Sequence, residues 1–364
     1  MSSESPRTTH VLVVDDSAVV RQTMLGLLSA QSGLTVDVAA DPIIAMEKMN
    51  VRRPDVIVLD LEMPRMDGMT FLRKIMREAP LPVIVCSGLV GAGSDAALRA
   101  LDEGAVDLIA KPQFGLKTFL NDSSVMLIDA IRAAALVNMP RARPFQRQRQ
   151  NADIVVPRLV RPPDVRQRFR VIAIGASTGG PDAICTILTE LPLNVPGVAV
   201  VQHMPEAFTA SFARRLDELC AIEVKEAEQG DEVRPGRALI ARGDRHLVLY
   251  EHASRLFVDV VRGPLVQRHR PSVDVLFRSV AQTVGPDAAG ILLTGMGEDG
   301  AEGLRELRDA GAWTIAESEE SCAVFGMPRA AIARGAATDV LPIEGIAPAL
   351  ARELFASPQD VRHR

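Results

Sequence analysis

Three side chains in the second half of the chain have the types and positions needed for acyl transfer. Ser177 stands in the glycine-rich turn 175–180, His203 follows the next apolar segment, and Asp299 stands in a second glycine-rich turn, 295–300. A hydroxyl nucleophile, an imidazole that accepts its proton and an acid that orients the imidazole form the set used by serine hydrolases. The pattern therefore predicts hydrolytic chemistry at Ser177.

A phosphate-binding loop is the alternative interpretation of the turn around Ser177. A dinucleotide-binding fold places an acid at the end of the next strand, where this chain has His203, and the turn contains neither G-x-G-x-x-G nor a G-K-[ST] ending. The turn does match the G-x-S-x-G nucleophile elbow, although the order serine, histidine, acid differs from that of α/β-hydrolases. Glu298 adjoins Asp299, and the flanking glycines do not choose between these two acids.

Polar side chains also follow four apolar segments in the first part of the chain. Asp15 and Asp16 follow the first segment, Asp60 ends the second, Ser87 follows the third and Lys111 follows the fourth. The carboxyl ends of parallel strands share one crevice, so these side chains are expected to converge. Three acids with Mg²⁺ can hold a phosphoryl group at one carboxylate, while a lysine and a hydroxyl contact its oxygens.

The elements that position these residues alternate between strands and helices. This alternation predicts an α/β fold with parallel sheets whose faces are covered by helices. We expect an N-terminal domain over 1–138, an arginine- and proline-rich linker over 139–168, a catalytic domain over 169–356 and a tail over 357–364. The C-terminal domain is expected to be α/β with a mostly parallel sheet.

Composition excludes several classes of protein. A chain of 364 residues, 47% of them hydrophobic, is long enough for two cores. The net charge of −5 and the lack of a helix-turn-helix pattern in the linker argue against nucleic-acid binding. The apolar runs are shorter than the ~18 residues of a membrane span, so we expect a cytoplasmic protein without direct membrane insertion. The four cysteines have no C-x-x-C spacing and are expected to be reduced and mainly buried; Cys322 is a poor rival nucleophile.

The first domain resembles response-regulator receiver domains. The resemblance rests on Asp15-Asp16, Asp60, Ser87 and Lys111. It implies a flavodoxin-like, doubly wound parallel five-stranded sheet in which Asp60 is the phosphoacceptor and binds Mg²⁺ together with the two preceding acids. Ser87 and Lys111 would sense the phosphoryl group. One departure is Leu108, which stands where receivers usually carry the aromatic residue of the switch.

The whole chain resembles the CheB family, chemotaxis protein-glutamate methylesterases/glutaminases. The motifs that carry this resemblance are 175–180, 202–205, 269–274, 294–300 and 325–328. The family implies that Ser177, His203 and Asp299 form the catalytic triad, which prefers Asp299 to its neighbour. It also implies that backbone N–H groups near Met296, with Thr178, support the oxyanion.

The same resemblance implies the partners and the regulation. The substrates would be glutamyl γ-methyl esters and specific glutamines on methyl-accepting chemoreceptors, and the phosphodonor would be a sensor histidine kinase of the chemotaxis type. The unphosphorylated receiver would cover the Ser177 crevice, and phosphorylation at Asp60 would bias it away. Glu317 and Ser318 depart from the family's usual Gln-Asp. Two alternatives remain: a receiver-controlled binding module with an inactive esterase-like domain, and a regulator that acts on nucleic acid through its linker.

Further segments carry structural expectations. Segments 239–250 and 255–260 alternate in polarity and predict a β-hairpin, and 272–283 predicts a helix. The basic approach to that helix, Arg268 to Arg270, either faces an acidic receptor helix or is a solvated charge cluster.

Overall fold

The computed structural model describes residues 8–88, 92–111, 117–137, 139 and 168–354. Within these residues the strands form a five-stranded parallel sheet, a seven-stranded parallel sheet and a three-stranded antiparallel sheet. The predicted α/β fold class is therefore confirmed. The predicted linker and tail lie almost wholly outside the described residues.

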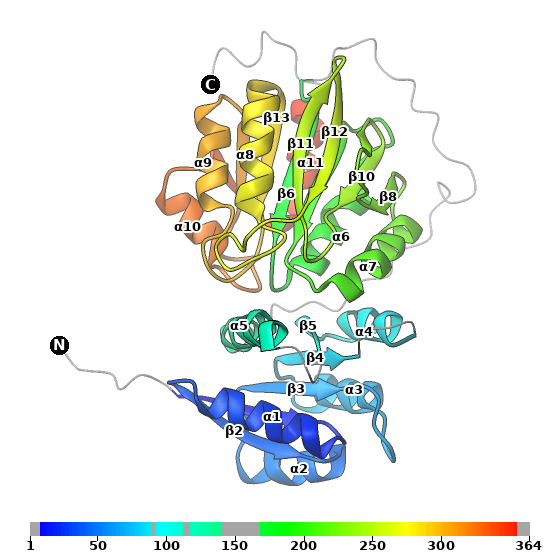
Figure 1. The fold of residues 1–364 in the computed structure, drawn as a ribbon, viewed down its shortest axis with the longest axis vertical. Coiled ribbons are helices and arrows are strands. Elements are labelled where there is room, and N and C mark those ends of the chain that lie inside the picture. Colours follow the sequence, from blue (N-terminus) through cyan, green and yellow to red (C-terminus); the bar gives the residue numbers. More distant parts are fainter. Residues whose placement is uncertain (1–7, 89–91, 112–116, 138, 140–167, 355–364) are drawn as a thin grey trace, which may run out of the picture.

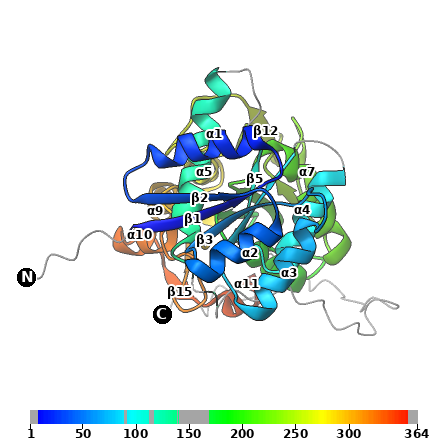
Figure 2. The same ribbon diagram turned by 90° about the horizontal axis from the view of Figure 1, so that it is seen from below.

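The five-stranded sheet has the strand order β2-β1-β3-β4-β5. Helices α1 and α5 cover one face, and α2, α3 and α4 cover the other (Figure 2). This is the doubly wound arrangement expected from the sequence. Its elements are β1 Thr9–Val14, α1 Ala18–Ser29, β2 Leu34–Ala39, α2 Pro42–Val51, β3 Val56–Asp60, α3 Gly68–Glu78, β4 Val83–Ser87, α4 Ala92–Asp102, β5 Asp107–Ala110 and α5 Lys117–Ala134.

Short polar side chains begin the first three helices. The hydroxyl oxygen of Ser17 accepts a hydrogen bond from the Val20 N–H, and the Asp41 and Asp67 carboxylates accept from first-turn N–H groups of α2 and α3. Each such cap satisfies a backbone donor that has no partner within the helix and contributes ~1 kcal/mol. Asp15 and Asp16 thus lie in the short loop between β1 and α1, and Asp60 ends the neighbouring strand β3 at the same edge of the sheet.

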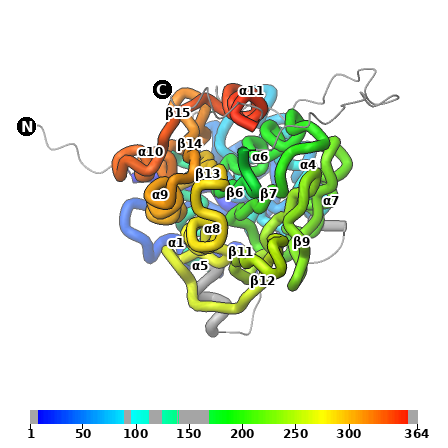
Figure 3. The backbone as a smooth tube through the Cα atoms, turned by 90° about the horizontal axis from the view of Figure 1, so that it is seen from above, coloured from blue at the N-terminus to red at the C-terminus, as the bar shows by residue number. Residues whose placement is uncertain are grey.

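The seven-stranded sheet has the order β15-β14-β13-β6-β7-β10-β8. Helices α6 and α11 lie on one face, while α8 and the β11–β12 hairpin lie on the other (Figure 3). Its elements and those of the hairpin are β6 Val171–Ala176, α6 Gly180–Glu190, β7 Gly197–Gln202, α7 Glu206–Leu219, β8 Glu223–Glu226, β9 Glu232–Val233, β10 Arg237–Ile240, β11 His246–His252, β12 Arg255–Val261, α8 Val273–Thr283, a 3-10 turn Gly285–Asp287, β13 Ala288–Leu292, α9 Ala301–Asp309, β14 Trp313–Glu317, α10 Met327–Ala333, β15 Asp339–Leu341 and α11 Ile343–Leu354.

The central strand β6 is apolar on both faces because both faces are covered. Ile172 and Ile174 belong to the core on the side of α6 and α11, whereas Val171 and Ala173 pack on the side of α8. Complete burial of a side chain such as isoleucine or valine contributes roughly 1.5–3 kcal/mol. This two-sided burial fixes the end of β6 and thereby the position of Ser177.

The predicted hairpin is confirmed, but its first strand begins at His246 and not at Leu239. The hairpin pairs β11 with β12, from His246 opposite Val261 to His252 opposite Arg255. Residues 239–240 belong instead to β10, which is parallel to β7 and β8. The chain turns between them at Asp244, which has φ 58°. The run Arg242-Gly243-Asp244-Arg245 interrupts the apolar positions at this turn and is the signal that separates the two strands. The helix predicted at 272–283 is confirmed as α8 with Ser272 as its N-cap.

The two domains meet at the carboxyl ends of the larger sheet. Figure 1 shows α4, β5 and α5 of the N-terminal domain lying against the end of the C-terminal domain from which α7 emerges. In the part of the chain that the structure describes, no helix is long and apolar enough to cross a membrane.

Candidate active site

Ser177 lies in a tight turn between β6 and α6. Its N–H donates to the Thr294 carbonyl at 3.0 Å, and its own carbonyl accepts from the Gly180 N–H at 2.7 Å. Gly179 has φ 77°, and a Cβ at Gly180 would lie 2.1 Å from the Gln202 side-chain oxygen. Only glycines fit these two positions, which explains why the sequence places them directly after the serine.

His203 is held beside this turn by the register of β6 and β7. Its N–H donates to the Ala176 carbonyl at 3.0 Å, so the imidazole emerges one residue past the end of β7. The ring Nε2 lies 2.8 Å from Asp299 Oδ2, and both side chains are buried. The other nitrogen, Nδ1, is buried and has no hydrogen-bond partner among the described residues. This leaves Nδ1 as the nitrogen that can receive a proton from a nucleophile.

Asp299 is embedded in hydrogen-bond donors from the start of α8. It accepts from the Ser272 hydroxyl at 2.8 Å and from the N–H groups of Val273 and Asp274 at 2.7 and 3.1 Å. Burial opposes its negative charge, but the hydrogen bond and charge of His203 together with these donors outweigh burial and lower the pKa of Asp299. The carboxylate therefore stays ionised beside the imidazole.

The choice between Asp299 and Glu298, which the motif left open, has a geometric answer. Glu298 is more than half exposed and forms an ion pair with Arg334. Asp299 is the acid that contacts His203.

His269 begins one of the motifs that carry the family resemblance, but the sequence assigned no role to it. Its ring lies 3.8 Å, centroid to centroid, from the ring of His203 with the planes tilted by 39°. Burial and the neighbouring His203 lower the pKa of His269 to about 3, so it is neutral near pH 7. No role was predicted for it because it follows no strand. The available signal was its place in the motif 269–274, three residues before the helix cap Ser272.

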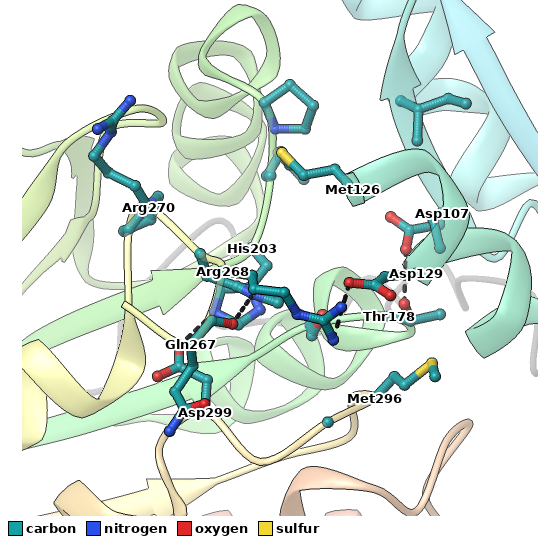
Figure 4. A pocket seen from close by; sticks show the side chains of 18 of the residues that line it. Asp107, Met126, Asp129, Thr178, His203, Gln267, Arg268, Arg270, Met296 and Asp299 are labelled. Atoms are coloured by element: carbon teal, nitrogen blue, oxygen red, sulfur yellow. Dashed lines mark hydrogen bonds and ion pairs between the residues drawn. The ribbon is translucent and has the colours of Figure 1, made fainter. Parts of the chain in front are cut away.

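A cavity of about 330 Å³ joins these residues to the N-terminal domain. Figure 4 shows Thr178, His203, Met296 and Asp299 on one side and Asp107, Met126 and Asp129 on the other. Ser177 also lines this cavity. The structure thus brings all five residues predicted for the triad and its oxyanion support to one cavity, and the first domain forms part of its wall.

Hydrogen bonds and ion pairs between the domains surround this cavity. The hydroxyl of Thr178, the neighbour of Ser177, donates to Asp107 Oδ2 at 2.8 Å. Arg268 lies 3.4 Å from Asp129 of α5. Burial raises the pKa of Asp107 to about 6. Its carboxylate is therefore mostly ionised at neutral pH and accepts the hydrogen bond from the Thr178 hydroxyl. Leu108, the residue that departs from the aromatic pattern, is buried in β5 and lines the same cavity.

A second polar cluster lies at the far edge of the five-stranded sheet. The carboxylates of Asp15, Asp16 and Asp60 offer oxygens within 4.8 Å of one another. Lys111 Nζ lies 2.6 Å from Asp60 and 3.1 Å from Asp15. Burial raises the pKa of Asp60 against the opposing effect of Lys111. Clustered carboxylate oxygens are the ligands that Mg²⁺ prefers, and one lysine offsets only part of their charge, so the residues fit this metal. Ser87 ends the neighbouring strand β4.

Glu317 supports the Ser177 turn from behind. It is 1% exposed at the end of β14, and its carboxylate accepts from the Thr294 N–H at 2.8 Å and from the Ser321 hydroxyl at 2.9 Å. Thr294 in turn donates its hydroxyl to the Thr178 carbonyl at 3.0 Å. The departure at Glu317 therefore places a carboxylate that accepts both hydrogen bonds where an amide would accept from Thr294 with its oxygen and donate to Ser321 with its NH₂ group.

We expect Glu317→Gln to change how stability depends on pH. Burial raises the pKa of Glu317 from 4.5 to about 7, so its stabilising contribution is full below pH 4.5 and is lost as pH rises through about 7. The glutamine does not titrate and keeps an acceptor for Thr294. The free energy of unfolding of the variant, taken relative to that of the parent, should therefore rise by roughly 3 kcal/mol between pH 4 and pH 8. Urea unfolding measures this free energy when it is followed by the fluorescence of Trp313. Trp313 is the single tryptophan and begins β14, the strand that Glu317 ends. Parallel curves for both proteins at the two pH values would contradict the prediction.

Comparison with known proteins follows the same division of the chain. Residues 172–350 match the CheB methylesterase family model, and residues 11–120 match the response regulator receiver domain model. A protein-glutamate methylesterase/protein-glutamine glutaminase of Anaeromyxobacter dehalogenans is 53% identical over 352 residues, covering 96% of this chain and 97% of that protein. This chain belongs to the CheB family.

Other CheB proteins are equally similar over the same length. One from Chromobacterium violaceum, named protein-glutamate methylesterase/protein-glutamine glutaminase 2, is 53% identical and covers 94% of this chain and 99% of its own. Among solved structures, the catalytic domain of the Thermotoga maritima CheB methylesterase is 40% identical, with a TM-score of 0.49, and covers 50% of this chain and 97% of that chain. The receiver domain predicted from Asp15, Asp16, Asp60 and Lys111 is thus confirmed as a family assignment.

Proposed function

We propose that this CheB protein is a phosphorylation-regulated protein-glutamate methylesterase and glutaminase that acts on chemoreceptors. The observation that carries the proposal is the cavity in which Ser177 lies with the hydrogen-bonded pair His203 and Asp299, closed on one side by the receiver domain. The names of the similar proteins support the same substrate class. A nucleophile, a base and an ionised acid in one buried cavity are suited to ester and amide hydrolysis.

The chemistry assigns one step to each residue. Ser177 Oγ attacks the glutamyl γ-carbonyl carbon while His203 Nδ1 accepts the hydroxyl proton, and Asp299 stabilises the resulting imidazolium. The tetrahedral intermediate collapses to an acyl-enzyme, and the imidazolium gives its proton to the departing methanol or ammonia. Water activated by His203 then releases glutamate and restores Ser177. Backbone N–H groups near Met296, with Thr178, are the proposed donors to the oxyanion.

The receiver domain supplies the regulation. Asp60 accepts the phosphoryl group from a histidine kinase, and Asp15, Asp16 and Asp60 would hold Mg²⁺, which offsets the negative charge of the incoming group. Lys111, now paired with Asp60 and Asp15, would pair with the phosphoryl oxygens instead. This rearrangement at the carboxyl end of β5 biases the receiver away from Thr178 and the cavity.

Methanol release from methylated chemoreceptor membranes tests this proposal. The full chain should release methanol faster with acetyl phosphate and Mg²⁺ than without them, because phosphorylation uncovers Ser177. Asp60→Asn should take no label from acetyl phosphate and should show the same low rate in both conditions. Release that is equally fast with and without donor in the parent would reject the regulation, and no release in either condition would reject the enzyme.

A further inference from the structure

The contact between the domains joins acids of the receiver to arginines of the catalytic domain. Arg214 of α7 lies 2.6 Å from Asp95 of α4, Arg215 forms an ion pair with Asp102, and Arg268 pairs with Asp129 of α5. Every one of these pairs has the same polarity. The receiver therefore presents an acidic surface to a basic surface that flanks the candidate active site, and we call Arg214, Arg215 and Arg268 the arginine surface.

Arg268 is the member of the arginine surface that reaches the cavity. It lines the cavity with Ser177 and His203, and it precedes His269, whose ring packs on His203. Its side chain is 63% exposed even with the receiver in place. Figure 4 shows its guanidinium pointing across the cavity toward Asp129. A group bound to Ser177 would thus lie close to this cation.

The carboxylate that pairs with Arg268 belongs to the receiver. The next arginine along, Arg270, differs: it donates to Asp244 and to the Gly263 carbonyl, both within the catalytic domain. Arg270 therefore keeps its partners when the receiver moves, whereas Arg268 loses Asp129. A cation at the mouth of an active site that loses its anion on activation is available to an anion on the substrate.

We propose that Arg268 selects acidic substrate segments and that Asp129 of the receiver occupies the position of a substrate carboxylate in the covered state. The substrate class is a peptide segment that carries Asp or Glu side chains beside the glutamyl γ-methyl ester. The receiver then excludes substrate by competition for the same charge as well as by covering Ser177. This inference rests on the proposed function and adds a determinant of specificity to it.

Two synthetic peptides test the inference with the full chain, acetyl phosphate and Mg²⁺. Each carries one central glutamyl γ-methyl ester; one has Asp and Glu around it, and the other has Asn and Gln. The parent should hydrolyse the acidic peptide with a kcat/KM about three- to fivefold higher, as expected for one partly exposed ion pair. Added salt should reduce this ratio because it screens exposed charges. Arg268→Ala should bring the ratio close to one by raising KM for the acidic peptide alone, and Arg268→Lys should restore part of it.

Asp129→Ala is the matched control because it removes the same ion pair from the receiver side. It should raise the rate without phosphoryl donor because the covered state loses an ion pair, but it should keep the parent's preference for the acidic peptide. Loss of the preference in Asp129→Ala would overturn the inference. The inference would also be overturned if the parent released methanol from receptor membranes but hydrolysed both peptides at the same rate, or neither of them. No release from those membranes by the phosphorylated parent would instead overturn the proposed function, and the inference with it.

Discussion

Ser177→Ala should abolish methanol release from methylated receptor membranes, with a loss of roughly 10⁵- to 10⁶-fold, the scale seen when a serine hydrolase loses its nucleophile. Alanine keeps the Cβ of the turn and both backbone hydrogen bonds of residue 177, since these use its N–H and carbonyl. The fold should therefore be unchanged while the attacking oxygen is gone. Rates of methanol release with saturating acetyl phosphate measure the effect.

The receiver provides the control for Ser177→Ala within the same chain. Because Asp60 and Lys111 lie in the other domain, the variant should take label from acetyl phosphate as fast as the parent does. A variant that is labelled normally and releases no methanol has lost the nucleophile and kept its structure. Turnover within about tenfold of the parent would rule Ser177 out as the nucleophile, since no mutant of a true nucleophile retains so much activity.

Asp299→Asn should lower the rate of methanol release by roughly 10⁴-fold, as in other triads in which the acid becomes an amide. The carboxylate now accepts from His203 Nε2, from the Ser272 hydroxyl and from the start of α8. An amide cannot stabilise the imidazolium, and its NH₂ group favours the tautomer in which Nε2 accepts. Nδ1 would then carry the proton and could not receive another from Ser177.

Glu298→Gln is the control for Asp299→Asn because it makes the same chemical change one residue away. Glu298 is exposed and pairs with Arg334 at the surface, so its loss should alter the rate less than about fivefold. The two variants thus separate the neighbouring acids of the glycine-rich turn by several orders of magnitude. Comparable losses in both would show that the turn is disturbed as a whole and that neither acid has a distinct role.

Much of the candidate site could be predicted because its residues follow strands. Ser177, His203 and Asp60 lie at or just beyond the ends of parallel strands, and such positions are read directly from apolar runs. The parallel sheet brings these strand ends together independently of the conformation of the loops that follow them. This is why residues 26 positions apart, such as Ser177 and His203, could be placed in one site from their local sequence alone.

The parts that sequence could not supply depend on contacts between distant loops. The stacking of His269 on His203 and the bond from Thr178 to Asp107 join segments with no common periodicity. The residues of the turn alone left Asp299 and Glu298 open, and only the family resemblance preferred Asp299; the three donors from the start of α8 that hold Asp299 come from a distant segment. The pairing of β10 with β7 and β8 likewise depends on distant segments, whereas the turn before β11 is marked locally by Gly243 and Asp244.

The central claim is that the receiver covers a nucleophilic Ser177 until Asp60 is phosphorylated. The most direct test is the rate at which a fluorophosphonate, which reacts with activated serines, labels Ser177 in the full chain. With acetyl phosphate and Mg²⁺ the parent should be labelled faster than without them, and Asp60→Asn should be labelled at the slow rate in both conditions. Labelling of the parent at one unchanged rate, with or without phosphoryl donor, would contradict the account.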